Sequence, residues 1–265
     1  MKRLIILLLC LTCGLMAVAQ QENGNTKVKV GVRVGGVGSY YIAPKGQSIS
    51  LNPSDDYAER SMKIGATAGL SIDILLNPKL HLQTGLMYSL QRNGEHGFGK
   101  NDSLFEPETE YDVDAYIKYQ SHHLKLPVML MYHASAKPNH FCLGAGVFAD
   151  FAMGGRLQYS SSARPTEGDS YLLEGDFNPY EVGNKYLYYH STNDPFSQKM
   201  LVGNGPYFKR FNFGVSAEIG YHISKFYLGA HLDIGVLNMA RPDVCGENYK
   251  QRPLDVQVMI GYNIN

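Results

Sequence analysis

The chain has 265 residues, with 24 basic and 24 acidic side chains and a formal net charge of zero. This balance leaves no basic footprint for nucleic acid. Of the four cysteines, two lie within the first 13 residues, and the remaining two, Cys142 and Cys245, are too few for a disulfide scaffold. The 28 glycines and 19 tyrosines, together with only 18% charged residues, favour a β-rich protein over a helical bundle.

The first residues have the form of a secretory signal. Lys2 and Arg3 precede an apolar run that ends in the small residues Ala17-Val18-Ala19, as a signal peptidase requires. The run has about 15 residues, fewer than the roughly 20 of a membrane-spanning helix, and no later segment is apolar for long enough either. We therefore expect a signal peptide at 1–19 and one mature domain at 20–265.

Strict alternation of side-chain character follows. In residues 63–74 every even position is apolar, and the odd positions carry lysine, glycine, threonine, serine and aspartate. Side chains alternate across a strand, so this segment has one apolar face and one polar face. The same period predicts eight strands, at 28–35, 63–74, 80–91, 123–132, 141–151, 211–223, 226–236 and 254–264.

The lengths of the strands and of their connections point to a membrane. Soluble strands average about five or six residues, whereas a tilted strand of roughly 9 to 11 crosses a bilayer. Short turns at 77–79, 135–140 and 224–225 alternate with long connections at 43–61, 94–115, 159–208 and 238–252. This rhythm is typical of outer-membrane barrels. We predict an all-β fold, an eight-stranded antiparallel transmembrane β-barrel in the bacterial outer membrane, with short periplasmic turns and long outer loops.

A soluble sandwich or lipocalin-like barrel also alternates, but its apolar face points inward onto a core. Here the polar face is rich in glycine and carries charges, while the apolar face is almost unbroken. This contrast favours an apolar face that meets lipid.

Three strand motifs carry a resemblance to a known group. They are Val-Lys-Val-Gly-Val-Arg-Val-Gly-Gly at 28–36, His-His-Leu-Lys-Leu-Pro-Val at 122–128 and Gly-Ala-Gly-Val-Phe at 144–148. With them the chain resembles the porin-family outer-membrane β-barrels, which include the PorT-like proteins of type IX secretion. The resemblance implies an eight-stranded barrel of a Gram-negative outer membrane and little about a ligand.

The polar faces are expected to fill the barrel, because eight strands enclose a space just wide enough for side chains. The inward positions, Arg156 included, carry five basic and five acidic residues, which predicts a hydrogen-bonded plug. The expected interior charge network is Lys29, Arg33, Lys63, Asp73, Lys125, Asp150, Glu218, His231, Asp233 and Asp255.

The short turns set the register of the strands. A two-residue hairpin at 224–225 places Glu218 opposite His231, and the turn at 135–140 places Lys125 opposite Asp150. Directly opposite residues have Cβ atoms about 5 Å apart, so Lys125 and Asp150 are expected to form a charge pair.

The two cysteines beyond the signal are expected to remain unpaired. Cys142 follows a periplasmic turn and Cys245 lies in an outer loop. A disulfide requires Cα atoms within about 7 Å, so most of the barrel height separates the two thiols.

The sequence predicts no catalytic residues, no metal site and no cofactor. His190 and Ser191, with Asp194, have the residue types of a lipid-modifying barrel enzyme, but they lie within a long loop that does not fix their geometry. His122 and His123 are neighbours on a strand and point to opposite faces, so together they cannot chelate one metal. A spaced ligand set is also missing.

The candidate binding element is the long outer loop at 159–208, since disordered loops normally contain few aromatic residues. Two functions remain open: a structural, binding or assembly component, or alternatively a lipid-modifying enzyme or narrow channel. The first function implies outer-membrane lipid and an extracellular glycan, peptide or protein as partners. A loop that only shields the barrel mouth is the alternative to a binding loop. The candidate binding residues are Tyr171, Phe177, Tyr180, Tyr186, Tyr188 and Tyr189.

Overall fold

The protein is described by a computed structural model that covers residues 28–42, 54–102, 110–165, 171–177, 184–191, 197–204, 208–240 and 250–264. The expected signal peptide and Cys245 lie outside these residues. Within them, no helix has the length and apolar character that a membrane crossing requires. The strands are β1 (Val28–Ile42), β2 (Ser54–Asn77), β3 (Leu80–Asp102), β4 (Glu110–His133), β5 (Asn139–Pro165), β6 (Tyr171–Phe177), β7 (Asn184–Ser191), β8 (Ser197–Asn204), β9 (Phe211–Ile223), β10 (Phe226–Gly235) and β11 (Arg252–Asn263).

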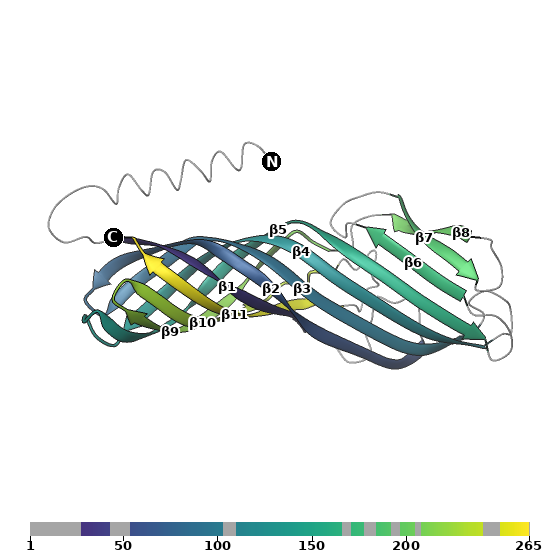
Figure 1. Cartoon of the computed structure of the whole chain (residues 1–265), viewed down its shortest axis with the longest axis horizontal. Helices are drawn as coiled ribbons and strands as arrows, with labels where there is room; N and C mark the ends of the chain where they lie inside the picture. The colour runs from purple at the N-terminus through teal and green to yellow at the C-terminus, as the bar shows by residue number, and fades with distance from the viewer. Residues whose placement is uncertain are drawn as a thin grey trace.

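Eight of these strands form a closed antiparallel ring in the order β1, β2, β3, β4, β5, β9, β10, β11 (Figure 1). The ring closes where β11 pairs with β1, with Val37 opposite Gln257. Closure pairs every ring strand on both sides, which is what a sheet in lipid needs. The predicted eight-stranded barrel is confirmed.

The outside of the ring is apolar and the inside is polar. Exposed and buried residues alternate along β9, where Ile219 is 53% exposed and its neighbour Glu218 only 5%. Val258 on β11 is 60% exposed in the same way. An apolar face that points away from the interior is the arrangement of a barrel solvated by lipid and excludes a soluble barrel with an apolar core.

Four neighbouring strands are much longer than a membrane crossing needs. β2, β3, β4 and β5 have 24, 23, 24 and 27 residues, against 15, 13, 10 and 12 for β1, β9, β10 and β11. Roughly 9 to 11 residues span the bilayer, so the four long strands project from one end of the ring as an outer extension (Figure 1). β6, β7 and β8 continue this sheet from the far part of β5.

The outer connections expected at 43–61, 94–115 and 159–208 are therefore partly strand, and this part of the prediction is wrong. The sequence pattern places the end of each strand at its last alternating apolar side chain. Backbone pairing continues past that point, because the hydrogen bonds of an antiparallel ladder do not depend on an apolar face.

Two of the bulges between ring strands change the face of side chains that were expected inside the barrel. In the β2–β3 ladder Ala66 faces Leu90 but Lys63 faces Arg92, so β2 has one extra residue. In the β4–β5 ladder the register shifts between His122 and His123, and the extra residue is on β5. An extra residue turns the side chains beyond it to the opposite face.

Lys63 and Arg156 both lie beyond these bulges. Their side chains are exposed, and both were expected inside the barrel, so that expectation is wrong for both. Even-odd parity fails across a bulge, and the sequence pattern alone does not mark the extra residue.

Candidate functional site

The interior polar network is built around Glu218 on β9. Arg33 Nη1 lies 2.8 Å from Glu218 Oε1, and the Tyr227 hydroxyl donates to the same oxygen at 2.7 Å. His231 Nδ1 lies 2.9 Å from Oε2. The Arg33 guanidinium also stacks over the Tyr227 ring, 4.1 Å from its centroid. Three buried donors thus hold one buried carboxylate in place.

The network continues through His231 to Asp233. His231 Nε2 lies 2.8 Å from Asp233 Oδ1, while its other ring nitrogen contacts Glu218. A histidine can donate from both nitrogens only as the imidazolium, so a charged His231 suits these two carboxylates. Ser216 and Gln257 also donate to Asp233, at 2.6 and 3.0 Å.

Lys125 joins the network from the far side of the barrel. Its ammonium group donates to Asp233 Oδ2 at 2.9 Å and to Asp255, which also accepts from Gln91 at 2.7 Å. The predicted register of Lys125 opposite Asp150 is confirmed, as is Glu218 opposite His231.

The expected charge pair between Lys125 and Asp150 is not the one that forms among the described residues. Asp150 contacts His123 Nδ1 at 2.9 Å, and the hydrogen bonds of Lys125 reach strands β10 and β11. A long, flexible lysine is not limited to its cross-strand neighbour when several carboxylates converge inside a narrow barrel.

The buried interior is acidic and not balanced. Of the ten charged residues expected inside, all five acidic ones are buried but only two basic ones. Lys29 is exposed at the end of β1, and Lys63 and Arg156 lie on the outward face. The buried ones are Arg33 and Lys125, with Asp73, Asp150, Glu218, Asp233 and Asp255. His123 and His231 also contact these carboxylates.

The interior is also filled. The cavity within the network has about 30 Å³, room for roughly two waters. At the outer end the rings of Tyr41, Tyr119 and Phe208 pack together with centroids 5.6 to 5.9 Å apart. Phe208 also bridges to Ala240, which is fully buried. Aromatic side chains therefore close the end of the barrel that faces the long connections.

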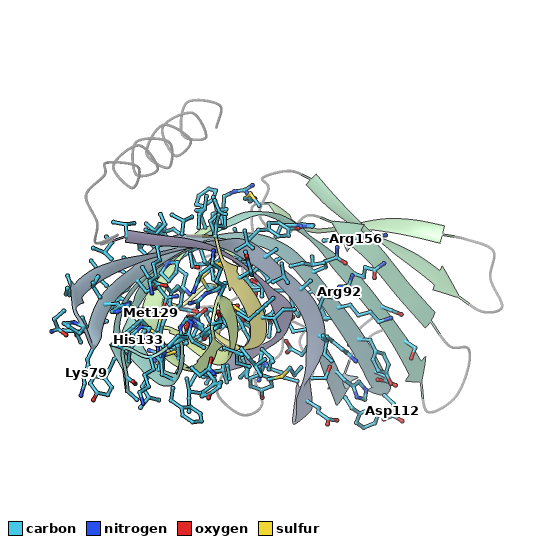
Figure 2. All side chains as sticks on the ribbon, turned by 60° about the vertical axis from the view of Figure 1, so that its left-hand side comes forward. Lys79, Arg92, Asp112, Met129, His133 and Arg156 are labelled. Atoms are coloured by element: carbon cyan, nitrogen blue, oxygen red, sulfur yellow. The ribbon has the colours of Figure 1, made fainter. Side chains whose placement is uncertain are left out.

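The outward face of the outer extension carries a basic row. Lys63 is directly opposite Arg92, and Gln120 lies between Arg92 and Arg156 in the neighbouring ladders. Lys118, in the adjacent row, is exposed as well. We call Lys63, Arg92, Lys118 and Arg156 the basic row; Figure 2 labels two of them on the extended strands.

An aromatic pair lies next to the basic row. The rings of His96 and Tyr116 stack with centroids 4.2 Å apart and planes 3° from parallel. His96 Nε2 lies 2.6 Å from Asp114 Oδ1. Since Tyr116 is 48% exposed, the pair presents a flat aromatic surface beside the cations.

Five of the six candidate binding residues lie on strands. Tyr171 is the first residue of β6 and Phe177 the last, while Tyr186, Tyr188 and Tyr189 lie on β7. Tyr180 lies outside the described residues. β7 also contains His190 and Ser191, whereas Asp194 is not described.

Sequence reasoning missed a group of histidines at the short-turn end. His133 and His140 flank the turn between β4 and β5, and His222 lies just before the turn between β9 and β10. The signal was present, because their inward parity and their position near short turns put all three at one end of the interior.

Comparison with known families gives one match. The family model described as outer membrane protein beta-barrel domain matches residues 18–241. The chain belongs to this family. Membership in the outer membrane protein beta-barrel domain family agrees with the closed ring and its apolar exterior, and it implies a place in the outer membrane. A closer relation to the PorT-like proteins stays a prediction.

Solved barrels of low identity are similar in fold to this member of the outer membrane protein beta-barrel domain family. Ail of Yersinia pestis, solved with the heparin analogue sucrose octasulfate, is 9% identical, with 90% of this chain and 99% of Ail covered and a TM-score of 0.32. OprG of Pseudomonas aeruginosa is 11% identical, with 89% and 96% covered and a TM-score of 0.39. Neisserial surface protein A is 12% identical, with 89% and 97% covered and a TM-score of 0.32. Among curated proteins none matches the chain.

Proposed function

We propose that the protein is a closed, non-enzymatic outer-membrane barrel that binds anionic saccharide groups at the cell surface through the basic row. The observation that carries this proposal is the placement of Lys63 directly opposite Arg92. Like charges at directly opposite positions destabilise a sheet. An anion shared between the two side chains removes that repulsion.

The height of the basic row on the barrel supports an anionic partner. On β4 the outward apolar side chains end at Leu124, and Gln120 lies four residues further out. On β3 the outward apolar side chains end at Leu90, two residues before Arg92. With about 3.3 Å per residue and a tilt near 40°, this places the row roughly 5 to 10 Å beyond the apolar band. Phosphate and carboxylate groups of outer-leaflet glycolipids occupy this level.

The chemistry of the row suits phosphate, sulfate or carboxylate. Arg92 and Arg156 each present a planar fork that pairs bidentately with such groups. The Gln120 amide lies between them and adds a neutral donor. The stacked rings of His96 and Tyr116 offer an adjacent flat surface for the body of a saccharide.

A filled barrel fits a binding protein better than a channel. The aromatic closure at Tyr41, Tyr119 and Phe208 and the small internal cavity leave little room for a passing solute. Exported by its N-terminal signal, the chain would hold the outer extension at the cell surface.

The test uses the folded protein in neutral nanodiscs and two forms of the same chemistry. One arm measures binding to vesicles that contain a phosphorylated outer-leaflet glycolipid, with dephosphorylated glycolipid for comparison. The other arm measures binding to a soluble sulfated polysaccharide. At about 1 kcal/mol for each cation near an anionic surface, the double variant Lys63→Gln, Arg92→Gln should bind roughly 30-fold more weakly. Lys79→Gln, in the exposed turn at the other end (Figure 2), is the matched control.

Preference for the vesicles identifies the membrane's own glycolipid as the source, and preference for the polymer identifies an extracellular one. Equal binding of phosphorylated and dephosphorylated ligands, or an equal loss in the Lys79 control, would contradict the proposal.

A further inference from the structure

Three histidines meet inside the barrel at the end that carries the short turns. His133 comes from β4, His140 from β5 and His222 from β9, which are consecutive strands of the ring. His140 and His222 are directly opposite each other in the β5–β9 ladder. One ring nitrogen from each residue lies within 4.8 Å of the other two. The three side chains line a cavity of about 250 Å³ at this end.

We propose that His133, His140 and His222 bind a transition-metal dication of the zinc class at the periplasmic mouth. Imidazole nitrogens suit zinc, copper and nickel. Three protein ligands with an open fourth position form a recurrent zinc arrangement. Metal–nitrogen bonds of about 2.0 to 2.1 Å place tetrahedral ligand atoms roughly 3.3 Å apart. The three ligand atoms lie within 4.8 Å of one another and the closest printed pair is 2.7 Å apart, so small side-chain rotations bring the set to that value.

The hydrogen bonds of His140 already orient it as a ligand. Its Nδ1 lies 2.6 Å from the Lys137 carbonyl oxygen, and a carbonyl only accepts, so Nδ1 carries the proton and Nε2 keeps its lone pair. Donation of the second ring nitrogen to a backbone carbonyl is the usual support of a metal-binding histidine. His140 Nε2 is the atom that faces His133, at 2.7 Å from His133 Nδ1.

His133 offers a second indication. It is 5% exposed, and its buried Nε2 atom has no hydrogen-bond partner among the described residues. Its ring stacks on His81 with centroids 3.9 Å apart. A buried polar atom without a partner is unfavourable, and a metal ion bound at Nε2 would supply the missing partner.

Charged groups around the cavity limit the affinity. Lys29, Lys137 and Lys225 line it together with Asp73. The three ammonium groups oppose a dication, while the carboxylate favours one, so we expect moderate binding that strengthens at high ionic strength. The same lysines make an anion the rival occupant.

The experiment titrates the folded, metal-stripped protein in nanodiscs with Zn²⁺ by calorimetry and with Co²⁺ by visible absorption. We expect one ion per chain and a tetrahedral Co²⁺ spectrum. The variants His140→Gln and His222→Gln should each weaken binding at least tenfold. His122→Gln is the control, because His122 faces outward at the middle of β4, eleven residues from His133, and contacts Tyr88.

Heat-modifiable gel mobility verifies that each variant is folded, so a loss of binding is not a loss of structure. Unchanged Zn²⁺ affinity in both variants, or an equal loss in His122→Gln, would overturn the proposal. So would saturable binding of inorganic phosphate at this mouth with no bound metal. These outcomes are independent of the basic row, which lies at the other end of the barrel.

Discussion

The ammonium group of Lys125 on β4 hydrogen-bonds to Asp255 on β11, the strand that stands opposite β4 in the ring of eight. It also donates to Asp233 on β10 at 2.9 Å. These strands share no backbone ladder with β4 within the described sheet. The polar interior therefore ties together walls of the barrel that the sheet connects only around its circumference.

Lys125→Met should destabilise the barrel strongly, because it leaves Asp255 without its cation and leaves Asp233 with His231 alone. Removing one partner of a buried pair costs about 3–5 kcal/mol. Lys125→Met combined with Asp255→Asn should recover part of that loss. Lys125→Met combined with Asp150→Leu should recover none, since Asp150 contacts His123.

Urea unfolding in lipid vesicles, followed by gel mobility, measures these differences. If the double variant with Asp150→Leu recovered more unfolding free energy than the one with Asp255→Asn, Asp150 would be the partner of Lys125 after all.

Substitution of the basic row should change stability in opposite directions in two membranes. Arg92→Gln relieves the repulsion from Lys63 and should stabilise the protein in neutral detergent by about 0.2–1 kcal/mol. In vesicles with phosphorylated glycolipid the same change should destabilise it, because the anion that bridges the cations is lost. The urea midpoint in each environment is the measurement, and a shift of the same sign in both would argue against anion binding.

Gly220→Ala should destabilise the barrel through Tyr227. A Cβ atom on Gly220 would lie 2.7 Å from the Tyr227 hydroxyl oxygen and would overlap the ring as well. Displacing this ring weakens its hydrogen bond to Glu218, and overpacking typically costs about 1–3 kcal/mol. Gly36→Ala is the matched control, since its nearest neighbour would be 4.0 Å away. Equal unfolding midpoints for the two variants would show that the wall tolerates displacement of Tyr227.

The reconstituted protein should pass no measurable current in a planar bilayer. The double variant Tyr119→Ala, Phe208→Ala removes the aromatic closure but leaves the charge network below it, so it should remain closed too. Discrete conductance steps in the wild type would contradict the filled interior. Conductance steps in the double variant alone would show that the aromatic rings, and not the network around Asp233, block the passage of ions.

Much of the fold follows from the sequence because period-two patterning is local. Residues 64–74 alternate so regularly that the strand, its apolar face and its inward aspartate can all be read directly. Short turns then fix the register, and the positions of Lys125 opposite Asp150 and of Glu218 opposite His231 are confirmed. Each of these features depends only on residues that are close along the chain.

The candidate sites depend on relationships that the sequence does not contain. One extra residue in β2 and one in β5 turn Lys63 and Arg156 outward beside Arg92, and nothing in the alternation marks a bulge in advance. The partner of Lys125 is decided by which carboxylates converge inside the barrel, and that depends on how the closed sheet is tilted and staggered.

By itself, the sequence determined the eight ring strands, which face of each meets lipid, and the side of the barrel on which the long connections lie. Only the tertiary structure decided that β2 to β5 continue beyond the ring, that the buried charges are acidic in excess, and that His133, His140 and His222 meet. The reason is that alternation and turn length act between neighbours, whereas closure of the ring brings together side chains as distant in the chain as Lys125 and Asp255.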